Sequence, residues 1–447
     1  MPQQILKTGK VFVPGQLPLF TYNPRSERNL ESLLRTYIDD GGAILTLVGP
    51  TKTGKTVLLE NVLEDPVWLE GQGLTDVDTF WTRVGSELDA YHDASRQEGA
   101  SESTDTGGKL GVPGVAEGNV QMTNGTSSGS TQAAIRATGS VVRKKLESSQ
   151  RVLVVDDFHF IDRAAQQEII RAVKPMVFNG VRVIFAAISH RVHDVPEAVE
   201  DMSQRAEPLV IELWSVDELR YIAREGFKAL NVVDHEEKLA TVLAENSFGS
   251  PHLMQKLCRE LVRQINGVFE TATVAVDLSA PSDWDEFFIK QIDSHSGKWY
   301  TKLFNGPPQR GNKRDVYKLK DGRIVDGYGL ILVAVASMAP ALTMTRQELN
   351  AAISELVENE QPTAHQLTRF LQHMTKIAAK KLTEAAPDEE ALDEESADDE
   401  ATFFGVDPAL EYVEDGSAST LNVADPFFAF YARWGGHLHI SMATEAK

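Results

Sequence analysis

The sequence lacks the features of secreted, disulfide-stabilised and membrane-spanning proteins. Its one cysteine, Cys258, has no partner for a disulfide within the chain, which agrees with a reducing compartment. No apolar stretch reaches the roughly 18 residues of a membrane span, and the longest, residues 330–338, has the length of a core helix. Residues 1–10 lack the apolar core of a signal peptide. We therefore expect a cytoplasmic protein without a membrane partner, with Cys258 buried as a small hydrophobic residue.

Positive charge is also scarce. The chain carries 44 lysines and arginines against 65 aspartates and glutamates, which gives a formal net charge of −21. Such a surface repels duplex DNA and anionic lipid unless a local basic cluster overrides it. One basic cluster does occur near the start of the C-terminal third. Its cations are Lys298, Lys302, Arg310, Lys313, Arg314, Lys318, Lys320 and Arg323. We expect this cluster to contact either nucleic acid or the acidic face of a neighbouring subunit.

The length of 447 residues predicts two to four domains at roughly 150 residues each. We expect an N-terminal lead-in at 1–40, an α/β core at 41–212, a helical lid at 213–282 and a C-terminal domain at 283–447. Residues 93–132 are rich in Gly, Ser, Thr and Asn and bury too little apolar surface to fold, so we expect a disordered insertion. The acidic run at 384–401 is expected to be a solvated loop.

Strand and helix patterns alternate in the first half of the chain. Strands are expected at 43–48, 66–69, 151–155 and 181–188, and helices at 26–40, 56–63, 76–91, 133–149 and 164–177. This alternation predicts a parallel sheet covered on both faces. Later helices are expected at 216–230, 235–245, 251–265, 328–338, 345–356 and 363–381. A hairpin is expected from 410–413 and 420–423 around the turn at 414–416.

A glycine-rich turn follows the first expected strand. The segment Gly49-Pro50-Thr51-Lys52-Thr53-Gly54-Lys55-Thr56 fits the phosphate-loop pattern G-x-x-x-x-G-K-[ST] without a mismatch. The two glycines let the backbone curl so that its N–H groups face phosphate, and the following helix N-terminus adds partial positive charge. Lys55 is placed to reach the β- and γ-phosphates, and the Thr56 hydroxyl to ligate Mg²⁺. We therefore predict that residues Gly49 to Val57 bind nucleotide and that Lys55 takes part in catalysis.

A second apolar strand, residues 152–155, ends in Asp156 and Asp157. Two carboxylates at a buried strand end form the usual acidic partner of a phosphate loop. We expect Asp156 to hold Mg²⁺ and Asp157 to orient or deprotonate the attacking water. Because aspartate is shorter than the glutamate common at the second position, Asp157 has further to reach. Two solvated aspartates capping a strand are the alternative interpretation.

The order of these motifs resembles a known family. Four motifs in this order resemble the STAND branch of AAA+-related ATPases. They are the phosphate loop, the Asp156–Asp157 strand, a strand ending in Ser189-His190-Arg191, and a lid with Gly249-Ser250-Pro251. They are also similar to archaeal replication-initiator and transposition-regulator ATPases. The resemblance covers residues 20–265 well and 325–435 loosely. It implies a three-layer α/β P-loop NTPase core, a helical lid, a C-terminal winged-helix-like domain, and ATP with Mg²⁺ as the ligands.

The resemblance also implies roles for single residues. It makes Arg191 the sensor of the γ-phosphate, with Ser189 as the alternative polar sensor, and places Pro251 and Tyr22 against the nucleotide base. Pro251 as an ordinary first helical residue and Arg191 as a surface arginine are the alternatives. Arg205 is a candidate finger toward a neighbour's nucleotide, with a surface ion pair as the alternative. His159 is a candidate for placing water or a neighbour, with a structural histidine as the alternative. The aromatic residues of the segment 425–434 are expected to be core.

These features predict an ATP-hydrolysing molecular switch. The chain carries no nuclease or protease motif, so we expect it to assemble with copies of itself or to regulate a separate effector protein. By analogy, such a chain would serve as the ATPase half of an antiviral defence or stress system. A DNA-binding loader or transposition regulator is the alternative, and a nucleotide-locked scaffold with negligible turnover is the third. ATP is favoured over GTP because no Asn-Lys-x-Asp guanine motif occurs.

Overall fold

The computed structural model describes residues 5–89, 128–188, 206–309, 311, 313–358, 360–380, 382, 408–415 and 418–445. The fold separates into two compact units. One unit comprises Met1–Ser32, Val48–Asn61 and Val210–Lys447, and the other comprises Leu33–Leu47 and Val62–Leu209. The acidic run 384–401 and residues 93–127 of the expected insertion lie outside the described residues. No helix among the described residues combines the length and the apolar character that crossing a membrane requires.

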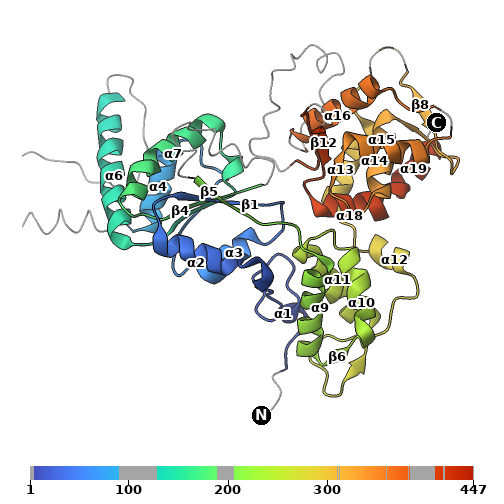
Figure 1. The fold of residues 1–447 in the computed structure, drawn as a ribbon, viewed down its shortest axis with the longest axis horizontal. Helices are drawn as coiled ribbons and strands as arrows, with labels where there is room; N and C mark the ends of the chain where they lie inside the picture. Colours follow the sequence, from blue (N-terminus) through green and yellow to red (C-terminus); the bar gives the residue numbers. More distant parts are fainter. Residues whose placement is uncertain are drawn as a thin grey trace, which may run out of the picture. The chain divides into compact units, whose positions relative to one another are not determined.

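The second unit is built on a parallel five-stranded sheet with the order β2-β3-β4-β1-β5 (Figure 1). The strands are β1 Ile44–Val48, β2 Val67–Glu70, β3 Leu153–Asp156, β4 Val183–Ala187 and β5 Ala206–Val210. Strands β1, β3 and β4 are buried along their whole length, as expected for a sheet covered on both faces. The α/β prediction and its four strands are confirmed. Strand β5 was not predicted, because Glu207 and Pro208 interrupt its apolar pattern; proline is tolerated there because β5 is an edge strand.

Three helices pack on one face of this sheet: α4 Val77–Glu87, α6 Ser128–Ser149 and α7 Arg163–Phe178 (Figure 1). Their apolar side chains form one core with Leu153 and Val155 of β3. These helices confirm the predicted ones. Helix α6 begins at Ser128, however, so residues 128–132, expected to be disordered, are helical. A composition rich in serine does not by itself exclude the start of a helix, because serine is favoured near helix N-termini.

The lead-in departs from the expected single helix at 26–40. A 3₁₀ turn, Ser26–Arg28, ends at Asn29, whose φ of 54° breaks the helical path before α2 Leu30–Asp40 begins. A short helix, α1 Thr8–Val11, lies earlier in the lead-in, and Phe12 directly after it packs against the lid. A Cβ atom at Gly226 would lie 2.2 Å from the Phe12 ring, so glycine is required for this packing.

The lid consists of α9 Val216–Leu230, α10 Lys238–Glu245 and α11 Pro251–Glu260, continued by the π-helical turn Leu261–Ile265. The small strands β6 Val232–Val233 and β7 Val276–Asp277 pair beside it. The three predicted lid helices are confirmed, and Cys258 is buried among them as expected. Helix α10 begins three residues later than predicted, because Glu236 and Glu237 adopt positive φ angles.

The C-terminal region has helices α12 Trp284–Ile289, α13 Ser294–Asn305, α14 Gly327–Ser337, α15 Arg346–Leu356, α16 Ala364–Ala378, α18 Pro426–Trp434 and α19 Gly436–Glu445. Its strands are β8 Val316–Lys318, β9 Ile324–Asp326, β10 Thr343–Thr345, β11 Glu411–Val413 and β12 Thr420–Asn422. The predicted hairpin is confirmed as β11 and β12, and the unpredicted β10 joins it in an antiparallel sheet of order β10-β12-β11.

One hydrophobic core joins the lid to the C-terminal region. The ring of Phe430 on α18 lies 6.2 Å from Phe248 of the lid and 6.1 Å from Phe288 of α12. Phe288 also stacks on Trp434 at 4.7 Å. The aromatic residues expected to be core in segment 425–434 therefore anchor α18 to the lid.

Candidate nucleotide-binding site

The phosphate-loop segment directly follows β1 and leads into α3 Lys55–Val62. A Cβ atom at Gly49 would lie 2.4 Å from the Ile211 carbonyl oxygen, so no side chain fits there. Gly54 has open space around it but a φ of +94°, which strains any other residue. The motif's two glycines are thus required for different reasons, one for close approach and one for backbone conformation.

The loop curls around a buried ammonium group. Lys55 Nζ donates to the carbonyl oxygens of Gly49 (2.8 Å) and Pro50 (2.9 Å), and the Thr53 hydroxyl donates to Pro50 as well (2.8 Å). Within the described part of the chain, the backbone N–H groups of residues 51–54 donate to no protein acceptor. Such N–H groups at a helix N-terminus, beside a lysine, form a cradle that fits phosphate oxygens.

Residues from the start of the lid hold the loop in this shape. The Trp214 indole N–H donates to the Thr53 carbonyl oxygen at 2.8 Å, and the Trp214 backbone N–H donates to Gly249 at 3.1 Å. Ser250, the N-cap of α11, places its hydroxyl 3.5 Å from the Lys52 carbonyl oxygen. Trp214 was missed from the sequence. The available signal was its position directly before the capping-box residue Ser215, where a helix begins.

Arg25 fixes Trp214 from the lead-in. Its guanidinium lies 5.0 Å from the Trp214 ring centroid and makes two hydrogen bonds to Glu218, at 2.9 and 3.1 Å. Burial raises the pKa of Glu218, but the hydrogen bonds from Arg25 and from the Ser215 N–H outweigh it, and the net pKa is lowered. Glu218 is therefore held as a carboxylate, and this partly buried ion pair stabilises the N-terminus of α9.

Two of the residues expected to contact the base lie in the same unit. The Tyr22 hydroxyl donates to Glu31 at 2.8 Å, and Pro251 occupies the first position of α11, directly after Ser250. The roles of Tyr22 and Pro251 against a nucleotide base stay predictions. Ser189 and Arg191 lie outside the described residues, as do Arg205 and Arg310.

The acidic strand end belongs to the second unit. Asp156, the last residue of β3, is 4% exposed, and its Oδ1 accepts from the Asp157 N–H at 3.0 Å. Asp157 adopts a φ of 53°, which is uncommon for residues other than glycine and marks a sharp turn. Gly71 donates to the Asp156 carbonyl oxygen at 2.7 Å, and a Cβ atom there would lie 2.2 Å from the Asp157 carbonyl oxygen. A strained, tightly packed turn thus sets the direction of both carboxylates.

The residues after this turn are fixed by packing. Phe158 stacks on Phe185 of β4 at 4.2 Å, and the Gln166 amide donates to the carbonyl oxygens of Phe158 (3.1 Å) and Ile161 (3.0 Å). His159 is 2% exposed, with its ring 4.4 Å from that of Phe160. This burial favours the structural interpretation of His159.

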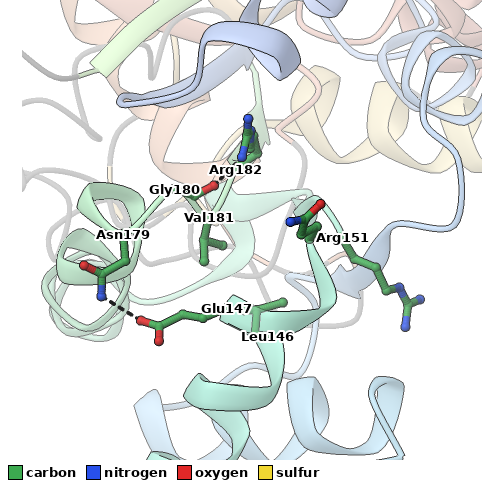
Figure 2. A pocket seen from close by; sticks show the side chains of 8 residues that line it. Leu146, Glu147, Arg151, Asn179, Gly180, Val181 and Arg182 are labelled. Atoms are coloured by element: carbon green, nitrogen blue, oxygen red, sulfur yellow. Dashed lines mark hydrogen bonds between the residues drawn. The ribbon is translucent and has the colours of Figure 1, made fainter.

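A cavity opens elsewhere on the second unit (Figure 2). It is lined by Leu146, Glu147, Gln150, Arg151, Asn179, Gly180, Val181 and Arg182. It lies before the first residues of β3 and β4, whereas ligand sites of parallel sheets lie beyond the carboxyl ends of the strands. Both arginines lining it donate hydrogen bonds to backbone carbonyl oxygens. Arg151 Nε donates to Asp65 at 2.7 Å, and Arg182 Nε donates to Ile38 at 2.8 Å. This cavity therefore carries structural arginines and is not a candidate nucleotide site.

Four of the eight cations in the basic cluster of the C-terminal region form ion pairs. The ion pairs are Arg314–Asp326 at 3.0 Å, Lys318–Glu358 at 2.6 Å, Lys320–Glu355 at 3.9 Å and Arg323–Asp321 at 2.6 Å. Arg314 also donates to the carbonyl oxygens of Asn305 and Pro307, so its role is structural. Lys298 and Lys313 are exposed. The sequence cluster therefore overstates the positive charge available to a partner.

Comparisons with known proteins give no family assignment. No family model matches the chain, and no curated protein is similar to it. Among solved structures, Cdc6p from Pyrobaculum aerophilum is 13% identical with a TM-score of 0.40, covering 98% of this chain and 100% of its own. The Aeropyrum pernix ORC2 protein, in ADPNP–ADP complexes, is 13% identical with a TM-score of 0.45, covering 99% and 100%. A Thermotoga maritima RuvB mutant is 13% identical with a TM-score of 0.35, covering 63% and 78%. The functional argument accordingly rests on this chain's own residues.

Proposed function

We propose that the chain binds ATP with Mg²⁺ and hydrolyses it as an AAA+-type P-loop ATPase. The observation that carries this proposal is the loop at residues 49–54, whose first two carbonyl oxygens hold the buried Lys55 ammonium and whose N–H groups at residues 51–54 have no acceptor among the described residues. Lys55 and the loop N–H groups would hold the phosphates, and Thr56 and Asp156 would hold Mg²⁺. Asp157 would position the attacking water, with Arg191 or Ser189 sensing the γ-phosphate. The ion would supply charge neutralisation on the phosphates.

Calorimetric titration of ATP in magnesium buffer tests the binding step. We expect saturable binding to the wild type and none to Lys55→Ala, because that change removes the ammonium in the loop. Lys228→Ala, at an exposed lid lysine, should bind like the wild type. We expect Asp157→Asn to retain binding and to lose most phosphate release. A wild type without ATP affinity would end the proposal. Unchanged turnover in Asp157→Asn would show that a residue other than Asp157 positions the attacking water.

The contacts of the loop support a switch. Trp214 and Ser250 join the loop to the lid, and the lid shares its core with α18. Nucleotide binding at the loop would therefore be transmitted to the lid and the C-terminal region. We keep four further points as predictions: the switch acts by self-assembly or by controlling a separate effector, the chain is affiliated with STAND ATPases, it serves in defence, and it is cytoplasmic. Mass photometry of the wild type and Lys55→Ala, with and without ATP, tests the self-assembly.

A DNA-binding regulator is the second candidate, favoured by the order of elements in the C-terminal region. The sequence α14–β10–α15–α16 is followed by the hairpin β11–β12, and β12 pairs between β10 and β11. We propose that this is a winged helix, in which α16 would be the helix that enters a DNA major groove. Exposed polar residues of α16 include His365 and Gln372, and the exposed Lys380 follows the end of the helix. Glu414 near the hairpin tip accepts a hydrogen bond from Gln372 at 2.6 Å, which places negative charge beside this helix.

Fluorescence anisotropy with duplex and single-stranded DNA at low salt tests this candidate. The informative variant is Lys298→Glu combined with Lys313→Glu, because changing Arg314 would break the structural ion pair with Asp326. Lys228→Glu with Lys238→Glu makes the same change in net charge at exposed lid positions. A selective loss of affinity in the first variant supports DNA binding by the cluster. Absence of ATP-dependent binding in the wild type would exclude the candidate.

A further inference from the structure

The side chain of Lys52 makes a contact that the phosphate-loop pattern does not require. The pattern accepts any residue at this position, since only the backbone is needed there. Here Lys52 Nζ lies 2.7 Å from Asp425 Oδ1, and 4.4 Å from the ring centroid of Phe427. A loop lysine is thus paired with a carboxylate more than 370 residues later in the sequence. The pair ties the phosphate loop to the start of α18.

Asp425 is held firmly in place. The same Oδ1 accepts the N–H of Phe427 at 2.9 Å, so Asp425 is also the N-cap of α18. The Asp425 side chain is 19% exposed and that of Lys52 is 33% exposed. Because α18 packs on the lid through Phe430 and Phe248, the hydrogen bond from Phe427 ties the position of the carboxylate to that of α18. While α18 is docked, that is, packed against the lid, the negative charge of Asp425 therefore lies beside the phosphate loop.

A second lysine and a histidine lie against the same aromatic ring. Lys256 Nζ lies 5.8 Å from the Phe427 centroid and donates to the Gln291 carbonyl oxygen, and the His252 ring lies 5.0 Å from Phe427. Lys52, Lys256 and His252 thus face Phe427, with Asp425 as the carboxylate paired to Lys52. Removing Lys52 from Asp425 would leave this carboxylate without its ion-pair partner. The pair is consequently sensitive to any second anion that approaches the loop.

We propose that Asp425 competes with nucleotide phosphate for Lys52, so that the docked α18 lowers the nucleotide affinity of the loop. This inference rests on nucleotide binding as the function of the loop. The phosphates bring several negative charges to the N–H groups beside Lys52; they attract its ammonium and repel Asp425. By thermodynamic reciprocity, bound nucleotide weakens the docking of α18 by the same factor by which docked α18 weakens nucleotide binding. The C-terminal region thereby responds to the occupancy of the phosphate loop.

The test compares ATP affinities by calorimetry in Asp425→Asn, Lys52→Gln and the double variant. Asparagine keeps an oxygen to cap α18, so Asp425→Asn removes charge without removing the cap. We expect this variant to bind ATP about five-fold more tightly than the wild type, at the lower end of usual coupling factors. Lys52→Gln should bind more weakly, because it leaves Asp425 unpaired beside the phosphates. The double variant should lie between the two single variants.

Asp326→Asn is the matched control. Asp326 also caps a helix, α14, through hydrogen bonds from the N–H groups of Tyr328 and Gly329, and also forms an ion pair, with Arg314. Its replacement should leave the ATP affinity unchanged. A wild type that binds ATP while Asp425→Asn binds equally or more weakly overturns the inference and leaves the proposed function intact. A wild type without ATP affinity overturns both.

Hydrogen exchange gives a second readout of the same pair. Without nucleotide, Asp425→Asn should increase exchange in residues 426–434 relative to the wild type, while Asp326→Asn should leave that segment unchanged. Adding ATP should raise exchange of this segment in the wild type and have no effect in Lys55→Ala. Equal exchange in this segment with and without ATP, in a wild type shown to bind ATP, would contradict the proposed coupling.

Discussion

At the residue scale, the candidate site depends on glycines that allow two segments of backbone to touch. Gly71 is the clearest case, since its absent side chain makes room for the Asp157 carbonyl oxygen, 2.2 Å from where a Cβ atom would be. Backbone cannot rotate away as a flexible side chain can. The turn that aims Asp156 and Asp157 would have to shift if residue 71 carried a methyl group.

We expect Gly71→Ala to lower the free energy of unfolding by about 1–3 kcal/mol and to reduce ATP turnover more strongly than ATP binding. The control is Gly139→Ala in α6, where the nearest atom to a new Cβ is Trp81 Cδ1 at 4.0 Å. Alanine favours a helix over glycine, so this control should retain or gain stability. Urea denaturation and steady-state phosphate release measure both quantities. Unchanged turnover in a folded Gly71→Ala protein would contradict the role of the turn.

His252 makes the stability of the lid depend on pH. Burial, followed by the charges of Lys52, Lys256 and Arg259, lowers the pKa of His252 from 6.5 to about 4. Between these values the unfolded chain binds a proton that the folded chain does not. The free energy of unfolding should therefore fall as the pH drops from 7 to 5, by about 2 kcal/mol from this group.

Urea denaturation at pH 7 and pH 5 measures this loss. His252→Gln removes the titrating ring, so its stability should fall less between the two pH values than that of the wild type. His365→Gln, at an exposed position on α16, should show the wild-type loss. Identical pH dependence in His252→Gln and the wild type would show that His252 is not responsible.

The sequence predicted the residues whose roles follow from local chemistry. Gly49, Gly54 and Lys55 were predicted by spacing, because the backbone requirement and the ammonium lie within one short segment. Trp214 and Asp425 were not predicted, since their importance arises from contacts with the loop that span 161 and 373 positions in the chain. The capping box marks Trp214 only as the residue before a helix start, and a single sequence contains no signal for the pairing of either residue with the loop.

At the element scale, length and periodicity decided what was predictable. Long amphipathic helices such as α7 and α9, and buried strands such as β1 and β4, have strong apolar patterns and were predicted within a few residues. The missed elements are short or mixed in polarity. They include β5, β6, β7, β8, β9, β10, α12 and α13. Three-residue strands alternate too few side chains to show a period, and their position is set by the chains they pair with.

The connection between β5 and α9 contains Trp214, whose contact with the phosphate loop can be tested by substitution. Trp214→Phe retains an aromatic ring for the Arg25 guanidinium but removes the N–H that bonds the Thr53 carbonyl oxygen. A hydrogen bond of about 1 kcal/mol corresponds to an approximately five-fold loss of ATP affinity. Trp68→Phe removes an indole N–H that bonds Glu70 on β2 and should leave the affinity unchanged. Equal affinities in all three proteins by calorimetry would contradict a supporting role for Trp214.

At the scale of the whole molecule, the net charge of −21 separates the two candidate functions. Copies of this chain repel one another, and salt screens this repulsion because the Debye length falls to about 10 Å at 0.1 M. Binding to DNA has the opposite dependence. It gains from counterions released when cations contact phosphate, so its affinity falls as salt rises.

A salt titration therefore gives opposite expected slopes. If the chain is a self-assembling switch, ATP-dependent assembly by mass photometry should increase between about 0.05 and 0.3 M salt, as screening weakens repulsion between copies. If the chain is a DNA-binding regulator, anisotropy should show weaker DNA binding over the same range. Lys55→Ala serves as the nucleotide-free control in both measurements. ATP-dependent assembly that weakens with salt would mean that attractive charge pairs between copies, rather than apolar contacts, hold the assembly. The exposed lysines of the basic cluster, Lys298 and Lys313, would then be the first residues to change.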